Sequence, residues 1–298
     1  MNWENLRADQ MAEAIEKSGG LCLFPLGCLE KHGYHLPLGV DSIRAKDVLE
    51  MTAELEDVMV FPTGMWLGDM IGSKSTPVEN NHGAISLNPH TLFTVIEELL
   101  DEIARNGFRK ILIIKSHGGN DPLISYLMRS HFDKKRDYAL MSTAFSGKVT
   151  RNPAKMYEHF WENRKDYPML GDEEFAVLKK FAELGSWGGG HADFLETAHI
   201  YGCRPELVEP KHFAVANGLT TDEISYLTDL EVAIAGGWGI THRHCYHGYD
   251  PIGCNQALGE AFVKYAAERF AKIVRVLKED EKCVDMQRSL YEIVESPV

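Results

Sequence analysis

The sequence predicts an α/β protein in which a parallel sheet carries helices on both faces. Four apolar runs suit buried strands, at 21–26 (LCLFPL), 58–63 (VMVFPT), 109–116 (RKILIIKS) and 138–145 (YALMSTAF). Segments with helical spacing of apolar residues separate these runs, and such alternation is typical of parallel sheets. Ligands of these sheets bind beyond the carboxyl ends of the strands, so a functional site is expected in the loops that follow the runs.

The helices are bounded by ordinary start and stop signals. We expect them at 5–18, ending at Gly19-Gly20, at 41–57, with Asp41 or Ser42 as N-cap, at 88–107, directly after residue 120, and at about 256–278.

The remaining segments have weaker patterns. Residues 64–83 read as a glycine-rich loop, and 146–190 and 211–250 read as less regular. We expect one domain over 1–298, in which 146–190 and 211–250 cover the end of the sheet or build subunit contacts.

Composition narrows the class of protein. A net charge of −13 argues against nucleic acid as the main partner, because phosphate binding needs a basic surface. The six cysteines form no CxxC pair and read as reduced thiols of a cytoplasmic protein. The N-terminus lacks the pattern of a signal peptide, and no run approaches the ~18 apolar residues of a membrane span. We therefore expect a cytoplasmic protein without a membrane partner.

The densest polar cluster follows the first strand. LGCLEKHGYHLPLGVD (26–41) contains Glu30, His32, His35 and Asp41. Glu30 and His32 project to the same side if the segment is extended. Nitrogen and oxygen donors of this kind suit Zn²⁺, Mn²⁺ or Fe²⁺. Taken alone, however, the pair would also fit an ordinary surface loop, and Cys28 reads as a packing residue.

Two later stretches add to this cluster. SHGGN (116–120) places His117 directly after the third strand, where two glycines allow close backbone approach, although a buried, hydrogen-bonded histidine in a tight turn would look the same. In GGGHADFLETA (188–198), His191 and Glu196 are five residues apart and cannot share one helical face. We expect His191 on the loop and Glu196 on the next element. The alternative to a functional site is that this stretch is only a flexible linker followed by a helix with an acidic N-terminus.

Together, EKHGYHLPLGVD, HGGN and HADFLETA resemble, in order, the motifs of the creatininase (creatinine amidohydrolase) family. SKSTPVENNHGAISL is a weaker match. The resemblance covers about residues 20–200 and implies a three-layer α/β/α sandwich with a mostly parallel central sheet.

The resemblance also implies two divalent metal ions, Zn, Mn or Fe. Glu30 and His117 would hold one ion, His32 the other, and Asp41 both. The glutamate that completes the second site in creatininase is replaced here by Gly119, so Glu196 is the expected substitute. Three carboxylates against two divalent ions would leave one net positive charge to stabilise a developing oxyanion.

The activity implied is hydrolysis of the C–N bond of a small linear or cyclic amide by a hydroxide activated by the two metals. His191 would be the catalytic proton shuttle. His35 is expected to orient the loop or a metal ligand rather than bind metal itself. Ser75 and Asn120 are candidate substrate contacts, and Asn120 is alternatively a helix cap. Trp187 is a further candidate substrate contact. Trp187 and Trp238 are both candidate pocket walls, with core packing as the alternative.

Departures from the family pattern at Ala84, Gly119, Asp193 and Ala198 point to a small amide or formamide other than creatinine. Two further hypotheses stay open: a formamide hydrolase with a single Fe or Zn ion, and a non-catalytic metal-binding member. The resemblance also implies a homo-oligomer, up to a hexamer.

Overall fold

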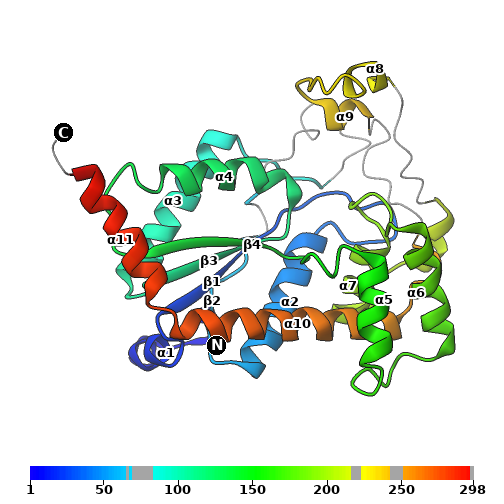
Figure 1. Ribbon diagram of the computed structural model, residues 1–298, viewed down its shortest axis with the longest axis horizontal. Helices are drawn as coiled ribbons and strands as arrows, with labels where there is room; N and C mark the ends of the chain where they lie inside the picture. The colour runs from blue at the N-terminus through cyan, green and yellow to red at the C-terminus, as the bar shows by residue number, and fades with distance from the viewer. Residues whose placement is uncertain (65–66, 69–82, 216–222, 242–250, 296–298) are drawn as a thin grey trace.

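Four parallel strands in the order β2-β1-β3-β4 form the centre of the computed structural model (Figure 1). The structure describes residues 1–64, 67–68, 83–215, 223–241 and 251–295. The strands are β1 (Leu21–Leu26), β2 (Met59–Val60), β3 (Lys110–Lys115) and β4 (Ala139–Ala144). Leu26 pairs with Lys115, which pairs with Ala144, so the carboxyl ends of three strands are level. The predicted strands are thus present, although β2 covers only part of 58–63.

Helices cover both faces of this sheet. α3 (Pro89–Arg105) and α4 (Asp121–Ser130) lie on one face, and α2 (Val40–Leu55) and α10 (Gln256–Glu279) on the other (Figure 1). Alternation along β1 explains the layering, because Cys22, Phe24 and Leu26 pack with α3 and α4. Leu21 and Leu23 pack instead with α2 and α10. The α/β/α sandwich expected from the sequence is confirmed.

Two helix starts differ from the prediction. The first turns of the chain are 3₁₀ helices at Trp3–Asn5 and Ala8–Gln10, and α1 itself spans only Met11–Lys17. α2 begins at Val40 with Gly39 as its N-cap, because the Ile43 amide already donates to the Gly39 carbonyl. The prediction that Asp41 or Ser42 caps this helix was wrong. Asp41 lies inside the first turn, and its side chain is available to the site.

Residues 146–190 are more regular than predicted. They contain α5 (Pro153–Glu162) and α6 (Asp172–Leu184), which pack with α7 (Phe194–Cys203) and α10 around one apolar cluster. The signals for these helices are present in the sequence. The Asn152 side chain caps α5 ahead of Pro153, and Gly185 closes α6 in the left-handed conformation.

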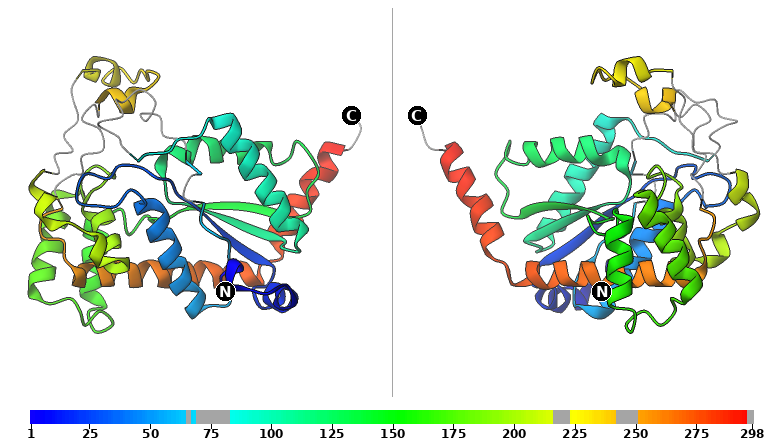
Figure 2. Two further views of the ribbon diagram at one scale, coloured as in Figure 1. Left: turned by 180° about the vertical axis from the view of Figure 1, so that it is seen from behind. Right: turned by 45° about the vertical axis from the view of Figure 1, so that its right-hand side comes forward.

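The other elements lie at the two ends of the sheet. Short helices at Pro205–Leu207, Pro210–Val215, α8 (Ser225–Thr228) and α9 (Gly237–Thr241) lie beyond its carboxyl end (Figures 1 and 2). The unpredicted α11 (Lys282–Glu295) lies at the opposite end (Figure 2). Within the described residues, no helix is both long and apolar enough to cross a membrane. That the chain forms one domain stays a prediction.

α7 packs closely on α10 through two glycines. A Cβ atom at Gly259 would collide with the Gly202 amide nitrogen and would lie 2.7 Å from the Ala198 carbonyl oxygen. The two backbones touch here without intervening side chains, and this contact fixes the height of α7, and with it Glu196, above the sheet.

Replacing Gly259 with alanine should therefore lower the free energy of unfolding by about 1–3 kcal/mol, as overpacking of a tight core does. Gly118→Ala is the matched control, because a Cβ there meets nothing within 4 Å and should change stability by less than about 0.5 kcal/mol. Urea denaturation measures both variants. Equal stabilities would contradict the close contact between the helices.

Candidate metal centre

Segments from four parts of the chain meet beyond the carboxyl ends of β1 and β3. The β1 loop supplies Glu30 and His32, the first turn of α2 supplies Asp41, and the end of β3 supplies His117. α7 supplies Glu196, and the loop before it supplies His191. These six predicted residues line one cavity of about 480 Å³. The five expected metal ligands have at most 6% of their surface exposed.

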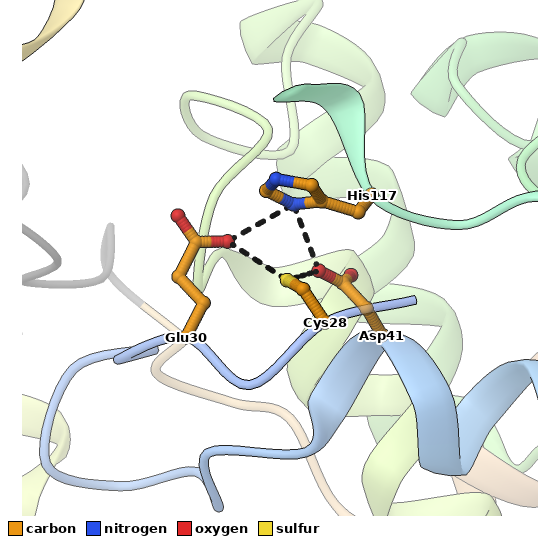
Figure 3. A group of neighbouring side chains, drawn as sticks. All are labelled: Cys28, Glu30, Asp41 and His117. Carbon is orange, nitrogen blue, oxygen red and sulfur yellow. Dashed lines mark hydrogen bonds and ion pairs between the residues drawn. The ribbon is translucent and has the colours of Figure 1, made fainter. Parts of the chain in front are cut away.

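The first donor group centres on His117. Its Nδ1 lies 3.1 Å from Glu30 Oε2 and 3.2 Å from Asp41 Oδ2 (Figure 3). Cys28 Sγ lies 3.3 Å from the same Asp41 oxygen. Figure 3 shows these four side chains pointing toward a common centre.

The second donor group centres on His32. Its Nε2 lies 3.5 Å from Glu196 Oε2 and 3.9 Å from Asp41 Oδ2. Its Nδ1 donates to the Glu30 backbone carbonyl at 3.1 Å, because a carbonyl can only accept. In the neutral ring Nε2 is then the unprotonated nitrogen, which is the tautomer that a metal ligand requires. Asp41 Oδ2 belongs to both groups.

A buried arginine that sequence reasoning missed supports the carboxylates from behind. Arg44 Nη2 donates to Asp41 Oδ1 at 2.7 Å and to the Ser116 carbonyl at 2.5 Å. Its Nη1 pairs with Glu196 Oε1 at 2.8 Å. The guanidinium therefore binds one oxygen of each carboxylate. The other oxygens, Asp41 Oδ2 and Glu196 Oε2, face the histidines. The position of Arg44, three residues after Asp41 on a helix, was the available signal.

Arg44 also changes the charge expected of the centre. Burial disfavours its charged form, but Glu196 and Asp41 outweigh burial and raise the pKa of Arg44. A permanent guanidinium adds one positive charge to the net of one that follows from three carboxylates and two divalent ions. With the two divalent ions that the resemblance implies, the centre would be more electropositive than the sequence indicated, which would favour an anionic nucleophile or oxyanion.

The ionisable groups of the first donor group stabilise one another. Burial opposes ionisation of Asp41, but Arg44 and then His117 and His32 hold the pKa of this carboxyl below its usual range. Burial likewise opposes charge on His117, yet Glu30, Cys28 and Asp41 raise its pKa well above the ordinary value. The carboxylates and the imidazole therefore each favour the charged form of the other.

The loop before α7 is fixed by its own hydrogen bonds. Ala192 has a positive φ of 46°, an uncommon conformation for a residue with a side chain, and its amide donates to Glu196 Oε2 at 2.6 Å. Asp193 caps α7 by accepting from the Glu196 amide at 3.0 Å. Burial, and then Glu196, raise the pKa of Asp193 to about 7. This role of Asp193 was not predicted, although an aspartate ahead of a helix is a common cap.

His191 lies over the second donor group. Its ring stacks on His32 at 4.4 Å between centroids, and Trp238 meets it edge-on at 5.6 Å. Its Nε2 donates to the Lys31 carbonyl at 2.9 Å. As expected, His191 is on the loop and Glu196 on the next helix.

Two further predicted residues, His35 and Asn120, do not line the cavity. His35 Nε2 lies 3.1 Å from the Thr197 hydroxyl, beside Glu196, which suits the predicted orienting role. Asn120 is fully buried and donates to the Leu67 carbonyl, so its side chain neither caps α4 nor reaches the cavity. Ser75 lies outside the described residues.

The predicted substrate contact of Trp187 does not fit its position. The indole is 4% exposed, stacks on Phe194 at 5.3 Å and donates to the Thr150 carbonyl. Aromatic packing therefore keeps Trp187 in the core, whereas Trp238, the other tryptophan considered, lines the cavity.

The donor set fits divalent metal ions. Imidazole nitrogens and carboxylate oxygens are the usual ligands of zinc and manganese, and both groups bring donors within 4.8 Å of one another in a buried setting. The fold and the site thus define an α/β protein with a buried histidine–carboxylate centre of metal-ligand type.

Comparison with known proteins names the family. A sequence model of the creatininase family, described as creatinine amidohydrolase, matches residues 4–274. The chain therefore belongs to the creatininase family. A creatinine amidohydrolase from Pseudomonas putida is 25% identical over 189 residues, which are 63% of this chain and 65% of that relative.

Solved structures agree on the fold. A crystal structure of creatinine amidohydrolase superposes with a TM-score of 0.64 at 17% identity, covering 94% of this chain and 98% of that one. A mutant creatininase described as the Zn–Zn type gives a TM-score of 0.63 at 18% identity with the same coverage.

Removing the guanidinium tests its supporting role. Arg44→Met should destabilise the metal-free protein by about 3–5 kcal/mol, because Asp41 and Glu196 would be left as buried, uncompensated charges. Adding Zn²⁺ should recover part of this loss, since the ion supplies the missing positive charge.

The control is Arg204→Met, which removes a half-exposed ion pair with Asp47 and should cost less than about 1 kcal/mol. Thermal and urea unfolding with and without Zn²⁺ measure both variants. If Arg44→Met were as stable as the control, the guanidinium would not be what permits burial of the carboxylates.

Proposed function

We propose that this protein is a metal-dependent amidohydrolase that cleaves the C–N bond of a small linear or cyclic amide with two divalent ions. The observation that carries the proposal is the shared position of Asp41 Oδ2, which lies 3.2 Å from His117 Nδ1 and 3.9 Å from His32 Nε2. Because Arg44 occupies Oδ1, Oδ2 is the oxygen that could serve both donor groups. A carboxylate between two such groups is typical of a dinuclear hydrolase.

The relatives support this choice of cofactor. One similar structure is described as a manganese form of creatininase and another as a Zn–Zn type. This chain offers nitrogen and oxygen donors of the same chemical class, so we propose Zn, Mn or Fe as its metals.

Bound at this centre, two divalent ions would supply Lewis acidity to an amide carbonyl and to water. The residues around them have separate tasks. His32 and His117 present imidazole nitrogens, and Glu30, Asp41 and Glu196 present carboxylate oxygens whose positions Arg44 and the Ala192 amide hold.

His191 is suited to move the proton that hydrolysis of an amide requires. Burial, and then neighbouring His32, lower the pKa of His191, so the ring is neutral near pH 7. Its Nε2 is committed to the Lys31 carbonyl, and Nδ1 is then the nitrogen that accepts a proton. We propose that His191 takes a proton from water at Nδ1 and delivers it to the leaving nitrogen.

The cavity indicates a small substrate. At about 480 Å³ it suits a compact molecule, and Trp238 provides an aromatic wall for a flat amide. The departures from the family motifs favour an amide or formamide other than creatinine. A contact with Ser75, a cytoplasmic location and assembly into a homo-oligomer, up to a hexamer, belong to the same proposal.

Metal content separates the dinuclear enzyme from its main alternative. We expect two equivalents of Zn²⁺ or Mn²⁺ per chain, about one in Glu196→Gln, and neither bound tightly in Asp41→Asn, because Asp41 serves both donor groups. Elemental analysis after dialysis measures this. One equivalent in the unaltered protein would exclude the two-ion proposal and favour the single-ion formamide hydrolase.

His191→Gln should keep its metal but lose about 10²–10⁴-fold in kcat, the usual contribution of a general acid–base residue. The assay is a panel of cyclic amides, creatinine included, and formamides. His90→Gln, on the exposed surface of α3, is the control and should retain full activity. Unchanged kcat in His191→Gln on a confirmed substrate would remove His191 from the reaction, and an inactive, metal-loaded protein on every amide would favour the non-catalytic alternative.

A further inference from the structure

Cys28 is held directly against the first donor group. It follows β1 at the point where Gly27 packs on Ser42, so closely that a Cβ at Gly27 would lie 2.7 Å from the Ser42 amide. On the other side, the backbone of Gly68 packs on the Cys28 side chain. The thiol is fully buried, and these contacts direct it toward Asp41 rather than into the apolar core.

The spacing of the four donor atoms resembles a coordination shell. Cys28 Sγ lies 3.3 Å from Asp41 Oδ2 and 3.7 Å from Glu30 Oε2, and His117 Nδ1 lies 3.1–3.2 Å from the same two oxygens (Figure 3). Ligands around one tetrahedral zinc ion lie about 3.3–3.6 Å apart, given bonds of about 2.3 Å to sulfur and about 2.0–2.1 Å to nitrogen or oxygen. These four separations are therefore close to those that a single ion would impose, and all four donor atoms lie within 4.8 Å of one another.

Other buried cysteines have different surroundings. Cys22 Sγ lies 3.8 Å from the Leu23 carbonyl, and Cys254 Sγ lies 3.9 Å from the Phe194 carbonyl, both within apolar clusters. Among the described cysteines, only Cys28 belongs to a group of potential metal donors. A packing role alone does not account for a sulfur facing two carboxylates and an imidazole.

We propose that the Cys28 thiolate is a direct ligand of the metal ion held by Glu30, Asp41 and His117. The proposal rests on the metal centre of the proposed function and adds a sulfur donor to one half of it. The other half, formed by His32, Asp41 and Glu196, has nitrogen and oxygen donors only. The two halves then differ in metal preference, because thiolate favours zinc and iron over manganese.

Cobalt substitution of the metal-free, 298-residue protein tests this inference without a substrate. Thiolate ligation gives bound Co²⁺ a charge-transfer absorption in the near ultraviolet. We expect this band in the unaltered protein and in Cys203→Ser, whose half-buried thiol lies outside the donor groups. Cys28→Ser should still bind cobalt but lack the band, because serine can donate to Asp41 as a thiol does yet supplies no sulfur.

A second measurement covers the case in which Cys28→Ser does not fold. X-ray absorption of the zinc-loaded, unaltered protein should show a sulfur neighbour at about 2.3 Å. In a folded Cys28→Ser variant, zinc affinity should fall roughly tenfold or more, and manganese affinity should fall less, since manganese gains little from thiolate.

The outcomes distinguish this inference from the proposed function. Metal bound at two equivalents without a sulfur neighbour, or a charge-transfer band that persists in Cys28→Ser, would overturn the thiolate ligand and leave the dinuclear centre standing. Failure of the unaltered protein to bind cobalt or zinc at all would overturn both.

Discussion

The centre depends on one buried guanidinium. The buried Asp41 lies within 4.8 Å of both Glu30 and Glu196, and carboxylates in that setting repel and resist loss of water unless cations accompany them. Arg44 supplies a permanent cation, joins α2 to the end of β3 through Ser116, and joins α2 to α7 through Glu196. It thereby aims the remaining carboxylate oxygens at the histidines before any metal is bound, which reduces the rearrangement that metal binding requires.

The fold brings these residues together in two ways, by alignment of parallel strands and by packing of helix on helix. The sheet aligns the carboxyl ends of β1 and β3, so that the Glu30 loop and His117 are neighbours although they are far apart in sequence. α7 is not part of the alternating strand–helix pattern, and it reaches the site because Gly202 and Gly259 let it lie against α10. α10 in turn packs on α2, which carries Asp41 and Arg44. A change in this helix stack would therefore move Glu196 relative to Asp41.

The two donor groups are unequal, and this inequality bears on function. One group contains a sulfur donor, whereas in the other the His32 ring stacks on His191, which Trp238 meets edge-on. Two ions bound at such a site can divide their tasks, since one metal ion can generate a nucleophile from bound water while another orients the substrate. In the proposed arrangement the His32 half, beneath the proton-carrying histidine, suits the first of these tasks.

The sandwich, the positions of the four strands and the six polar residues that line the cavity could all be predicted from the sequence. Strand and helix periodicity follows from local burial, and the motifs around Glu30, His117 and His191 are short enough to read along the chain. The contacts that those residues make follow from the tertiary fold and could not be predicted. Arg44 and Cys28 are unremarkable in sequence, since their roles come from atoms up to 152 positions away, as in the pair with Glu196. Trp187 and Trp238 cannot be distinguished from the sequence. Trp187 lies in the core and Trp238 lines the cavity because of how residues distant in sequence pack around each indole.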